Sequence, residues 1–272
     1  MEPTLTPPAR TKIFFTSDAH LGSYYHQDAL AVERKLTAWL DSIKYEAIAL
    51  YLLGDMFDYW FEYKTVVPRG HVRFLGKLAE LSDMGVEIHF FAGNHDIWFT
   101  DYLGQEIGAT IHHRPIITDL LGKRFRLSHG DSEYCPLKKS YNFLYHAFRS
   151  PLLIKLYGAI HPRWTVGFAM NWSLRSRKKG LKQETEGKIP HAYRNEYFNV
   201  EDEWLVKFSK EYSLQHPDID FFIYGHRHIM MDLAIKNDKR VVILGDWLSY
   251  FSFGVWDGSA FYLEVWDPQE QA

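Results

Sequence analysis

The chain has 272 residues, of which 46% are hydrophobic and 24% charged, a composition typical of a water-soluble protein with a substantial core. Its net charge of −3 indicates no overall preference for nucleic acid or for an anionic membrane. The single cysteine excludes an intrachain disulfide and is typical of a reducing compartment. No segment approaches the roughly 18 apolar residues of a membrane span, and residues 1–10 lack the apolar stretch of a signal peptide. We therefore expect a cytoplasmic protein with a flexible N-terminus.

Short apolar runs of the kind that form buried strands alternate with helical patterns along the chain. Residues 29–43 and 71–84 carry apolar side chains at three- and four-residue spacing, which predicts helices. This alternation predicts βαβ units and a largely parallel sheet, in which sites gather at the carboxyl ends of the strands. The strand-like runs are residues 13–16, 48–53, 88–92, 125–128 and 219–224.

Four more strand-like runs follow the last of these. They are short and consecutive, so we expect antiparallel strands that form a second sheet packed on the first. These runs are residues 229–235, 240–244, 250–255 and 260–265.

Residues 136–200 interrupt the rhythm of strands and helices. The segment has no strand-like run, and its apolar residues keep helical spacing over 143–148 and 152–160. Its part from Lys138 to Gln183 contains ten Lys and Arg but no Asp or Glu, so the chain outside these residues carries a net charge of −13. This composition predicts a helical, apolar and basic insertion.

Five short motifs rich in His, Asp and Asn each follow a predicted strand. Any one of them alone is a weak signal, but five in order at five strand ends are not expected by chance. Imidazole nitrogens with carboxylate or amide oxygens suit a divalent ion such as Mn, Fe, Co or Zn. Seven such ligands exceed the needs of one ion, so the motifs predict two ions that share a bridging carboxylate. The motifs are Asp18-Ala19-His20, Gly54-Asp55-Met56-Phe57-Asp58, Gly93-Asn94-His95-Asp96, His129-Gly130-Asp131 and Gly225-His226-Arg227-His228.

The expected ligands divide between the two ions, with Asp55 as the bridge. A water held by both ions would lose its proton near neutral pH and attack phosphorus in line. This chemistry predicts a binuclear metal phosphoesterase. One ion is expected to bind Asp18, His20, Asp55 and His228, and the other Asp55, Asn94, His129 and His226.

Two further residues of the third motif are expected to act beside the metals. His95 follows the ligand Asn94, so both would lie at the substrate, and His95 would supply a proton or charge to the phosphate or the leaving oxygen. Asp96 would fix the tautomer of His95. Asp58 and Asp131 are better explained as supporting carboxylates than as ligands.

The five motifs resemble those of the calcineurin-like metallophosphoesterases. The resemblance covers residues 13–265 apart from the insertion, and it implies an α/β fold: an αββα sandwich of two mixed sheets around two metal ions, most commonly suggested to be Mn. It also implies one metallophosphoesterase domain over residues 11–268, with residues 136–200 as a helical cap insertion. The Ser/Thr protein phosphatases of this family carry arginine where this chain has Tyr59.

A closer resemblance is to the UDP-2,3-diacylglucosamine hydrolases of lipid A biosynthesis, which also insert a helical cap between the fourth and fifth motifs. It rests on residues 50–60, on Cys135 and on Leu244-Gly245-Asp246-Trp247. The resemblance implies water attack on the α-phosphate of the substrate's pyrophosphate, giving UMP and 2,3-diacylglucosamine 1-phosphate. The best-known members carry arginine where this chain has His95.

The basic and apolar insertion suits a substrate with two acyl chains at an anionic membrane, which predicts a peripheral protein on the inner face of the bacterial inner membrane. Trp164, Phe168 and Trp172 could face lipid, although such a stripe also occurs in a plain core. The basic residues could instead form a solvated face. Those expected to hold the pyrophosphate are Arg175, Arg177, Lys178, Lys179 and Lys182.

Three alternatives remain open from the sequence. A soluble phosphodiesterase or phosphatase for nucleotides or other small phosphate esters would use the same motifs. Nucleic-acid cleavage would suit the ten basic residues, but these alternate with apolar rather than polar side chains. A scaffold without activity is disfavoured because all seven ligand positions are intact. No protein partner is indicated.

Overall fold

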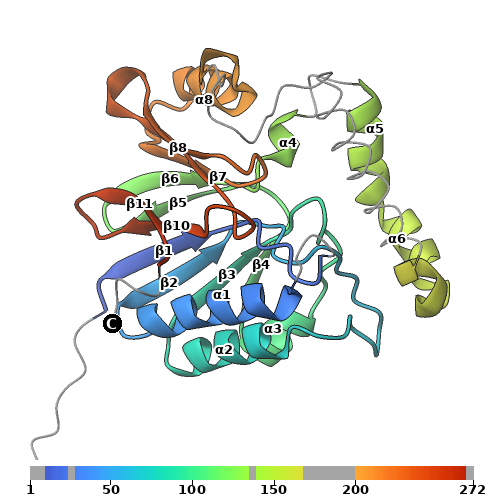
Figure 1. Cartoon of the computed structure of the whole chain (residues 1–272). Coiled ribbons are helices and arrows are strands. Elements are labelled where there is room, and N and C mark those ends of the chain that lie inside the picture. The colour runs from blue at the N-terminus through green and yellow to red at the C-terminus, as the bar shows by residue number, and fades with distance from the viewer. Residues whose placement is uncertain (1–9, 24–27, 135–138, 168–199, 268–272) are drawn as a thin grey trace, which may run out of the picture.

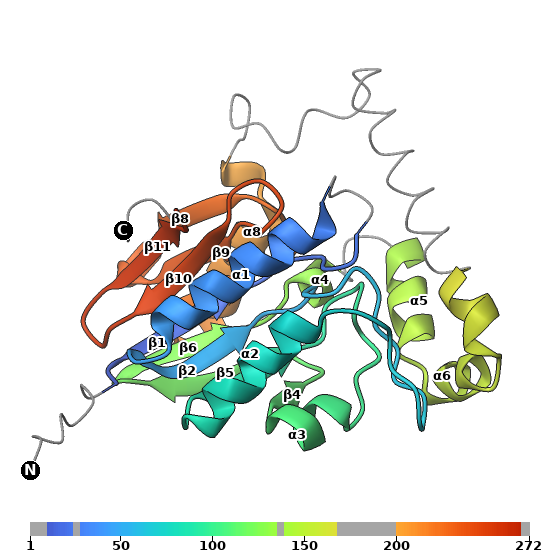
Figure 2. The same ribbon diagram turned by 60° about the horizontal axis from the view of Figure 1, so that its bottom comes forward.

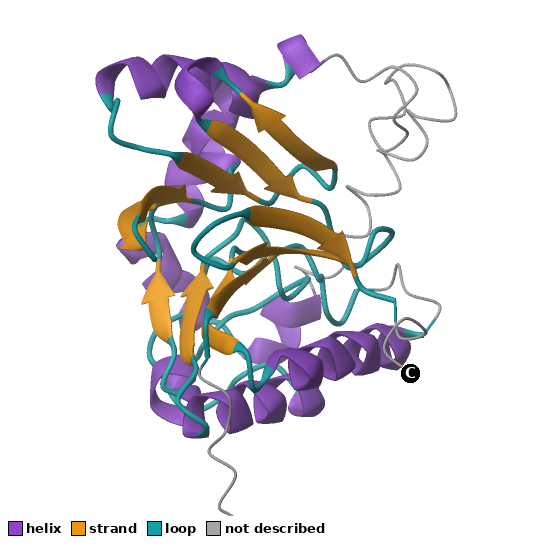
Figure 3. Ribbon diagram, turned by 90° about the vertical axis from the view of Figure 1, so that its left-hand side faces the viewer, coloured by secondary structure: helices purple, strands orange, loops and turns teal. Residues whose placement is uncertain are grey.

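The structure, a computed structural model, describes residues 10–23, 28–134, 139–167 and 200–267. Two β-sheets pack face to face at its centre, and helices cover the outer face of each (Figure 1). Figure 3 shows the strands of both sheets between the helices on either side. The fold is the α/β sandwich of two mixed sheets that the sequence predicts.

The first sheet has six strands in the order β11-β10-β1-β2-β3-β4. Strands β1 to β4 run parallel, whereas β10 pairs antiparallel with β1 and β11 pairs antiparallel with β10. The strands are β1 (Lys12–Thr16), β2 (Ala47–Leu52), β3 (Glu87–Phe91), β4 (Thr110–His112), β10 (Ser252–Trp256) and β11 (Phe261–Val265).

The second sheet has five strands in the order β5-β6-β7-β9-β8. Its central strands β6, β7 and β9 are parallel, and the two edge strands are antiparallel to their neighbours. The strands are β5 (Ile116–Leu120), β6 (Lys123–Leu127), β7 (Phe221–Tyr224), β8 (Met230–Ala234) and β9 (Arg240–Leu244).

All nine predicted strands form, but their expected distribution between the sheets is wrong. Strands β6 and β7 belong to the second sheet rather than to one long parallel sheet, and β10 and β11 join the first sheet. An apolar run indicates burial but not which neighbour a strand pairs with. The pairing of β10 with β1 places Gly254 opposite Phe15, and an added Cβ at Gly254 would lie 2.6 Å from the Phe261 ring. Only a glycine leaves room for that ring.

Helices on the first sheet form where the apolar periodicity predicts them. Helix α1 (Ala29–Ile43) has the predicted bounds, and Asp28 caps it by accepting from the backbone N–H groups of Leu30 and Ala31. Its buried face includes Leu36, Trp39 and Leu40, which pack on the sheet. The remaining helices of the core are α2 (Val72–Asp83), α3 (Tyr102–Ile107), α4 (Asp131–Tyr134) and α8 (Trp204–Gln215), with the 3₁₀ turns η3 (Val200–Asp202) and η4 (Lys236–Asp238).

Aromatic side chains fill the space between the two sheets. The Phe15 ring lies 5.4 Å from that of Tyr51 in its own sheet and 5.9 Å from that of Phe125 in the facing sheet. Burial of each such side chain contributes roughly 1.5–3 kcal/mol to stability. This core fixes the strands of one sheet relative to those of the other, and therefore fixes the loops at their ends.

Helices α5 (Lys139–Phe148) and α6 (Pro151–Gly158) stand away from the two sheets in both views (Figures 1 and 2). They form where residues 143–148 and 152–160 show helical spacing. Several contacts join this part to the core. Arg149 pairs with Asp131 at 2.8 Å, and the Trp98 indole donates to the Phe148 carbonyl. The hydroxyl groups of Tyr59 and Tyr157 lie 3.2 Å apart, and the Tyr157 ring also stacks on that of Trp98. Among the described residues, no helix has the length and apolar character needed to cross a bilayer.

Candidate metal centre

The five motifs lie at the carboxyl ends of five strands and converge on one place. Asp18, Asp55 and Asn94 follow the neighbouring strands β1, β2 and β3, while His129 and His226 follow the neighbouring strands β6 and β7 of the facing sheet. Side chains as far apart in the chain as His20 and His228 come within 3.3 Å of each other. The predicted clustering at strand ends is confirmed.

One group of side chains consists of Asp18, His20 and His228. The Nε2 atoms of the two histidines lie 3.3 Å apart. Asp18 Oδ1 lies 3.4 Å from His228 Nε2 and 3.9 Å from His20 Nε2. One potential ligand atom from each residue therefore lies within 4.8 Å of the others, which is the spacing expected around a single cation.

The second group consists of Asp55, Asn94, His129 and His226. His129 Nε2 is at its centre, 3.3 Å from Asp55 Oδ2, 3.2 Å from Asn94 Oδ1 and 3.2 Å from His226 Nδ1. Asp55 Oδ2 also lies 3.8 Å from His20 Nε2 in the first group. Asp55 thus lies between the two groups, where a bridging carboxylate would have to be.

The outer nitrogen of several histidines has an acceptor, which sets the tautomer. His129 Nδ1 donates to the Leu53 carbonyl at 2.8 Å, and His228 Nδ1 lies 3.0 Å from Asp246 Oδ2. His20 Nδ1 lies 3.4 Å from Asp58 Oδ1. With the proton on Nδ1, the Nε2 lone pairs of these rings point into the two groups, as in metal-binding histidines.

A buried oxygen supports the same interpretation. Asp18 Oδ1 is buried and makes no hydrogen bond in the structure, although it faces His228. A buried carboxylate oxygen normally has a donor or a cation as its partner. The donor set of imidazole nitrogen, carboxylate and amide oxygen therefore fits divalent metal ions.

Strained backbone positions gather at the same place. Asp18, His20, Asp55, His226 and His228 all have positive φ, between 43° and 67°. Non-glycine residues seldom adopt this conformation, which costs on the order of 1–3 kcal/mol per residue and recurs at functional sites. The turns aim the side chains inward, and the hydrogen bond from His226 N to Asp18 Oδ2 at 2.8 Å locks two of them together.

Three glycines allow these turns to approach one another. An added Cβ at Gly54 would lie 2.7 Å from His129 Nδ1, and one at Gly225 would lie 2.5 Å from Asp18 Oδ2. A Cβ at Gly93 would collide with the Asp55 carboxylate. The glycines of the motifs are therefore required by close approach to the ligand side chains rather than by the turns alone.

The expected role of Asp96 towards His95 is wrong. Asp96 is fully buried, and its carboxylate accepts from the backbone N–H groups of Gly93 at 2.9 Å, Asp55 at 3.0 Å and Phe57 at 3.2 Å. It therefore joins the second motif to the third. His95 Nδ1 instead donates to the Asp58 carbonyl at 3.1 Å, because the turn after β3 directs Asp96 inward and His95 towards the second motif.

The two supporting carboxylates lie where a supporting role requires. Asp58 Oδ1 lies 3.4 Å from Nδ1 of His20 and 3.7 Å from Nδ1 of His95. Asp131 follows His129 and pairs with Arg149, which begins the connection between α5 and α6. Asp58 thus steadies the centre itself, whereas Asp131 anchors the helical segment beside it.

Charge and burial set the protonation of these groups in the protein without metal. Burial raises the pKa of Asp55, but the charges of the neighbouring His129 and His95 lower it. Their combined effect is the larger, so the pKa of Asp55 lies well below its usual value. Burial lowers the pKa of His20 to about 3 against the opposing effect of Asp58. Burial also lowers the pKa of His129, but the charge of Asp55 raises it well above the usual value, so a metal bound there would displace a proton.

Sequence reasoning missed Asp246, which is buried behind His228. The signal for it in the sequence is Gly245-Asp246-Trp247, which carries part of the resemblance but lies outside the five motifs. The predicted pyrophosphate-binding residues Arg175, Arg177, Lys178, Lys179 and Lys182 lie outside the described residues, as do Phe168 and Trp172.

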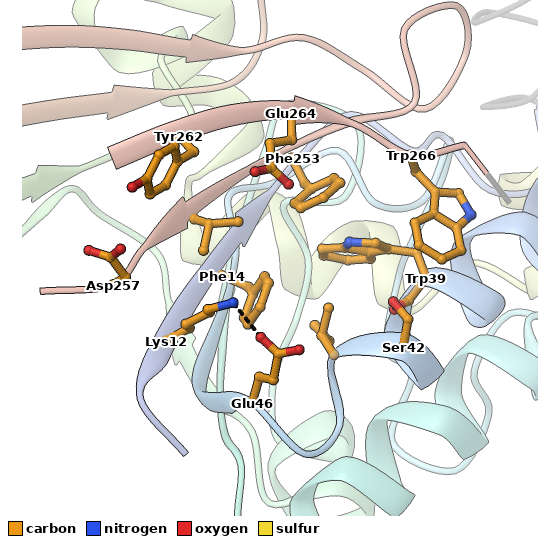
Figure 4. Close-up of a pocket in the computed structure, with 12 residues that line it drawn as sticks. Lys12, Phe14, Trp39, Ser42, Glu46, Phe253, Asp257, Tyr262, Glu264 and Trp266 are labelled. Atoms are coloured by element: carbon orange, nitrogen blue, oxygen red, sulfur yellow. Dashed lines mark hydrogen bonds and ion pairs between the residues drawn. The ribbon is translucent and has the colours of Figure 1, made fainter. Parts of the chain in front are cut away.

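A separate pocket of about 370 Å³ is lined by residues of α1, β1, β10 and β11 (Figure 4). Its lining includes the aromatic side chains of Trp39 and Phe253 and the ion pair of Lys12 with Glu46. None of the described residues that line it belongs to the five motifs. This pocket is therefore separate from the candidate metal centre.

Comparison with known proteins shows which family the chain belongs to. Residues 11–230 match the model of the calcineurin-like phosphoesterases. A Porphyromonas gingivalis protein named UDP-2,3-diacylglucosamine hydrolase is 59% identical over 96% of this chain and 100% of its own length. A Nitrosococcus oceani protein of the same name is 26% identical over 86% of each chain. The solved E. coli phosphoesterase Yfce aligns over 96% of this chain and 95% of its own, with 15% identity and a TM-score of 0.42. The family match over most of the chain, together with the first relative, shows that the chain belongs to the calcineurin-like phosphoesterase family.

Proposed function

We propose that the protein is a metal-dependent hydrolase that cleaves the pyrophosphate of UDP-2,3-diacylglucosamine to UMP and 2,3-diacylglucosamine 1-phosphate. The observation that carries this proposal is the 59% identity to a UDP-2,3-diacylglucosamine hydrolase over its whole length. The convergence of the seven predicted ligands on one place supports it independently.

Two divalent ions, with Mn favoured by the resemblance, would be held by the residues of the two groups, with Asp55 between them. Such a pair of ions activates a water and stabilises the charge that develops on a phosphoryl group. Asn94 contributes a neutral oxygen, which limits the negative charge that the substrate's phosphate meets. The proposed ligands are Asp18, His20, Asp55, Asn94, His129, His226 and His228.

His95 is the proposed proton donor to the phosphate or the leaving oxygen. Its Nδ1–H is held by the Asp58 carbonyl, so the ring is fixed and Nε2 is the atom that can face the substrate. The side chain is 26% exposed, more than those of His20 and His129, which suits contact with a substrate. Asp96 would contribute by fixing the backbone of both adjoining motifs.

An apolar cavity beside the centre supports a lipid substrate. It has a volume of about 700 Å³ and begins at Asp58, next to His20 and His95. Its walls include Leu21, Leu30 and Phe61, and its size is that of a ligand pocket. A soluble nucleotide ester would have no use for this space, whereas the acyl chains of the proposed substrate could fill it.

The outer surface of α5, α6 and the helical residues 162–167 supports docking on a membrane. Phe143, Leu152, Leu156 and Trp164 are 56–72% exposed there, although monomeric soluble proteins seldom expose a large apolar patch. The proposed cap, residues 136–200 within a domain of residues 11–268, is also free of acidic residues between Lys138 and Gln183. We place the protein at the cytoplasmic face of the bacterial inner membrane, with this surface against anionic lipid.

Replacing Leu152 and Trp164 together by serine is expected to weaken binding to vesicles of phosphatidylglycerol and phosphatidylethanolamine by at least about tenfold, because each buried side chain contributes about 1.5–3 kcal/mol. Cosedimentation with the vesicles measures the loss, and hydrolysis of a soluble aryl phosphodiester should be unchanged. The matched control is Leu214→Ser on α8, where the leucine is 76% exposed. If all three proteins bind vesicles alike, α5 and α6 do not dock on the membrane.

The experiment that tests the function is UMP release from UDP-2,3-diacylglucosamine dispersed in detergent with Mn, with Asp55→Ala as the blank. Metal-dependent release that the variant lacks is the expected result. A wild-type protein that hydrolyses a soluble aryl diester but releases no UMP would retain the phosphoesterase centre and reject the lipid substrate.

A further inference from the structure

The turn after β9 places a carboxylate directly behind a proposed metal ligand. Asp246 is 3% exposed, and its Oδ2 lies 3.0 Å from Nδ1 of His228. It lies outside the five motifs and 18 residues further along the chain than His228. The Nε2 atom of the same ring faces Asp18 and His20. Asp246 therefore contacts the side of the His228 ring that is turned away from the proposed metals.

The two oxygens of Asp246 have separate partners. Oδ1 accepts from three successive backbone N–H groups, those of Leu248 at 3.1 Å, Ser249 at 2.7 Å and Tyr250 at 3.1 Å. Only Oδ2 contacts the histidine. Because three donors surround Oδ1, the carboxylate cannot turn over without losing all three hydrogen bonds. Its orientation towards His228 is fixed.

The same turn is attached to the first motif. The backbone N–H of Trp247 donates to the Asp18 carbonyl at 3.1 Å, and its indole N–H donates to Thr16 Oγ1 at 2.6 Å. Trp247 is fully buried. Asp246, which contacts Nδ1 of His228, is thus held in a fixed position relative to Asp18, which faces Nε2 of the same ring.

We infer that Asp246 is a positioning residue of the metal centre, which keeps the proton of His228 on Nδ1 so that Nε2 remains free to bind a metal ion. A carboxylate behind a metal-binding histidine commonly has this effect on its tautomer and ring orientation. The inference rests on the proposed metal centre but not on the identity of the substrate.

Two substitutions separate positioning from a structural role. In Asp246→Asn the amide oxygen would stay with the three backbone donors, so the NH₂ group would face His228 Nδ1. An NH₂ group donates, which would force the proton onto Nε2 and block that ligand. Asp246→Ala would leave the three N–H groups without their acceptor but would leave the ring free to choose either tautomer.

The two substitutions should therefore rank in opposite orders for thermal stability and for Mn affinity. Thermal unfolding of the protein without metal should be less affected by Asp246→Asn than by Asp246→Ala. Affinity for Mn, titrated by calorimetry on the apo protein, should fall by about 100-fold in Asp246→Asn and by about 10-fold in Asp246→Ala, the range typical of residues behind a metal ligand.

Asp257→Asn is the matched control, since Asp257 Oδ1 also accepts two backbone N–H groups in a turn, those of Ser259 and Ala260. It should bind Mn as the wild type does. If Mn affinity instead follows stability, with Asp246→Ala the weaker binder, or if Asp246→Asn binds as the wild type does, Asp246 has only a structural role. A wild-type protein that binds no divalent ion would overturn the proposed centre as well.

Discussion

Asp55→Asn is expected to lose one or both metal ions and to slow hydrolysis of an aryl phosphodiester by at least about 10³-fold, since bridged ions contribute several kcal/mol and each 1.36 kcal/mol changes the rate tenfold. Asp55 Oδ2 lies between the two groups of ligands, 3.3 Å from His129 Nε2 and 3.8 Å from His20 Nε2. A neutral amide cannot balance the charge of two cations from that position.

The same substitution should leave the fold intact. The amide has the shape of the carboxylate, and its oxygen can still accept from the backbone N–H of His95, as Asp55 Oδ1 does at 2.8 Å. Plasma mass spectrometry, which measures the metal content per chain, tests the expected loss of metal. The unfolding temperature of the apo protein tests whether the fold is intact. Asp41→Asn, which changes an exposed ion pair with Lys77, is the control. If the Asp55→Asn protein binds two ions tightly and hydrolyses the ester within tenfold of the wild-type rate, Asp55 is not the bridging ligand.

The convergence of the proposed ligands was predictable because each motif is local to the strand before it. The apolar run of β2 ends at Leu52, and Gly54-Asp55 follows at once, so the position of the carboxylate follows from the strand. Parallel strands of one sheet bring such ends together by geometry alone. A motif also follows β1 and β3 in this sheet and β6 and β7 in the facing sheet, so these strand ends meet in the same way.

The division of strands between sheets was not predictable in the same way. Strand β10 is buried along its whole length, so its side-chain pattern suits either sheet. Its pairing with β1 depends on contacts from distant residues, such as the Phe261 ring that occupies the space beside Gly254. No local pattern contains that information.

The groups that hydrogen-bond to the histidines of the centre were also not predictable from local sequence. Asp96 is adjacent to His95 in the chain, which made it the natural orienting group, but its carboxylate turns inward to three backbone N–H groups. Asp58 and Asp246, which contact the histidines in the structure, are 37 and 18 residues away from them in the chain. The sequence motifs predict well which side chains converge but predict poorly which groups hydrogen-bond to them, because the conformation of the folded turns selects those partners.

His95→Ala is expected to keep both metal ions and yet lose about 10²- to 10⁴-fold in turnover, the usual contribution of a positioned proton donor. The imidazole lies within 4.8 Å of the ligand atoms of His20 and Asp55, but its Nδ1 is held by the Asp58 carbonyl and its side chain is partly exposed. We therefore expect it to contact the substrate rather than to bind a metal ion.

The leaving group distinguishes the two possible roles of His95. If His95 protonates the leaving oxygen, the loss should be larger for a phenyl ester, whose leaving oxygen needs a proton, than for a p-nitrophenyl ester, which departs as an anion. If His95 only supplies charge to the phosphate, both esters should slow equally. His216→Ala, which removes an imidazole that stacks on Tyr212 outside the centre, is the control for loss of a histidine. A His95→Ala protein with normal rates on both esters and a full complement of metal would exclude His95 from the reaction.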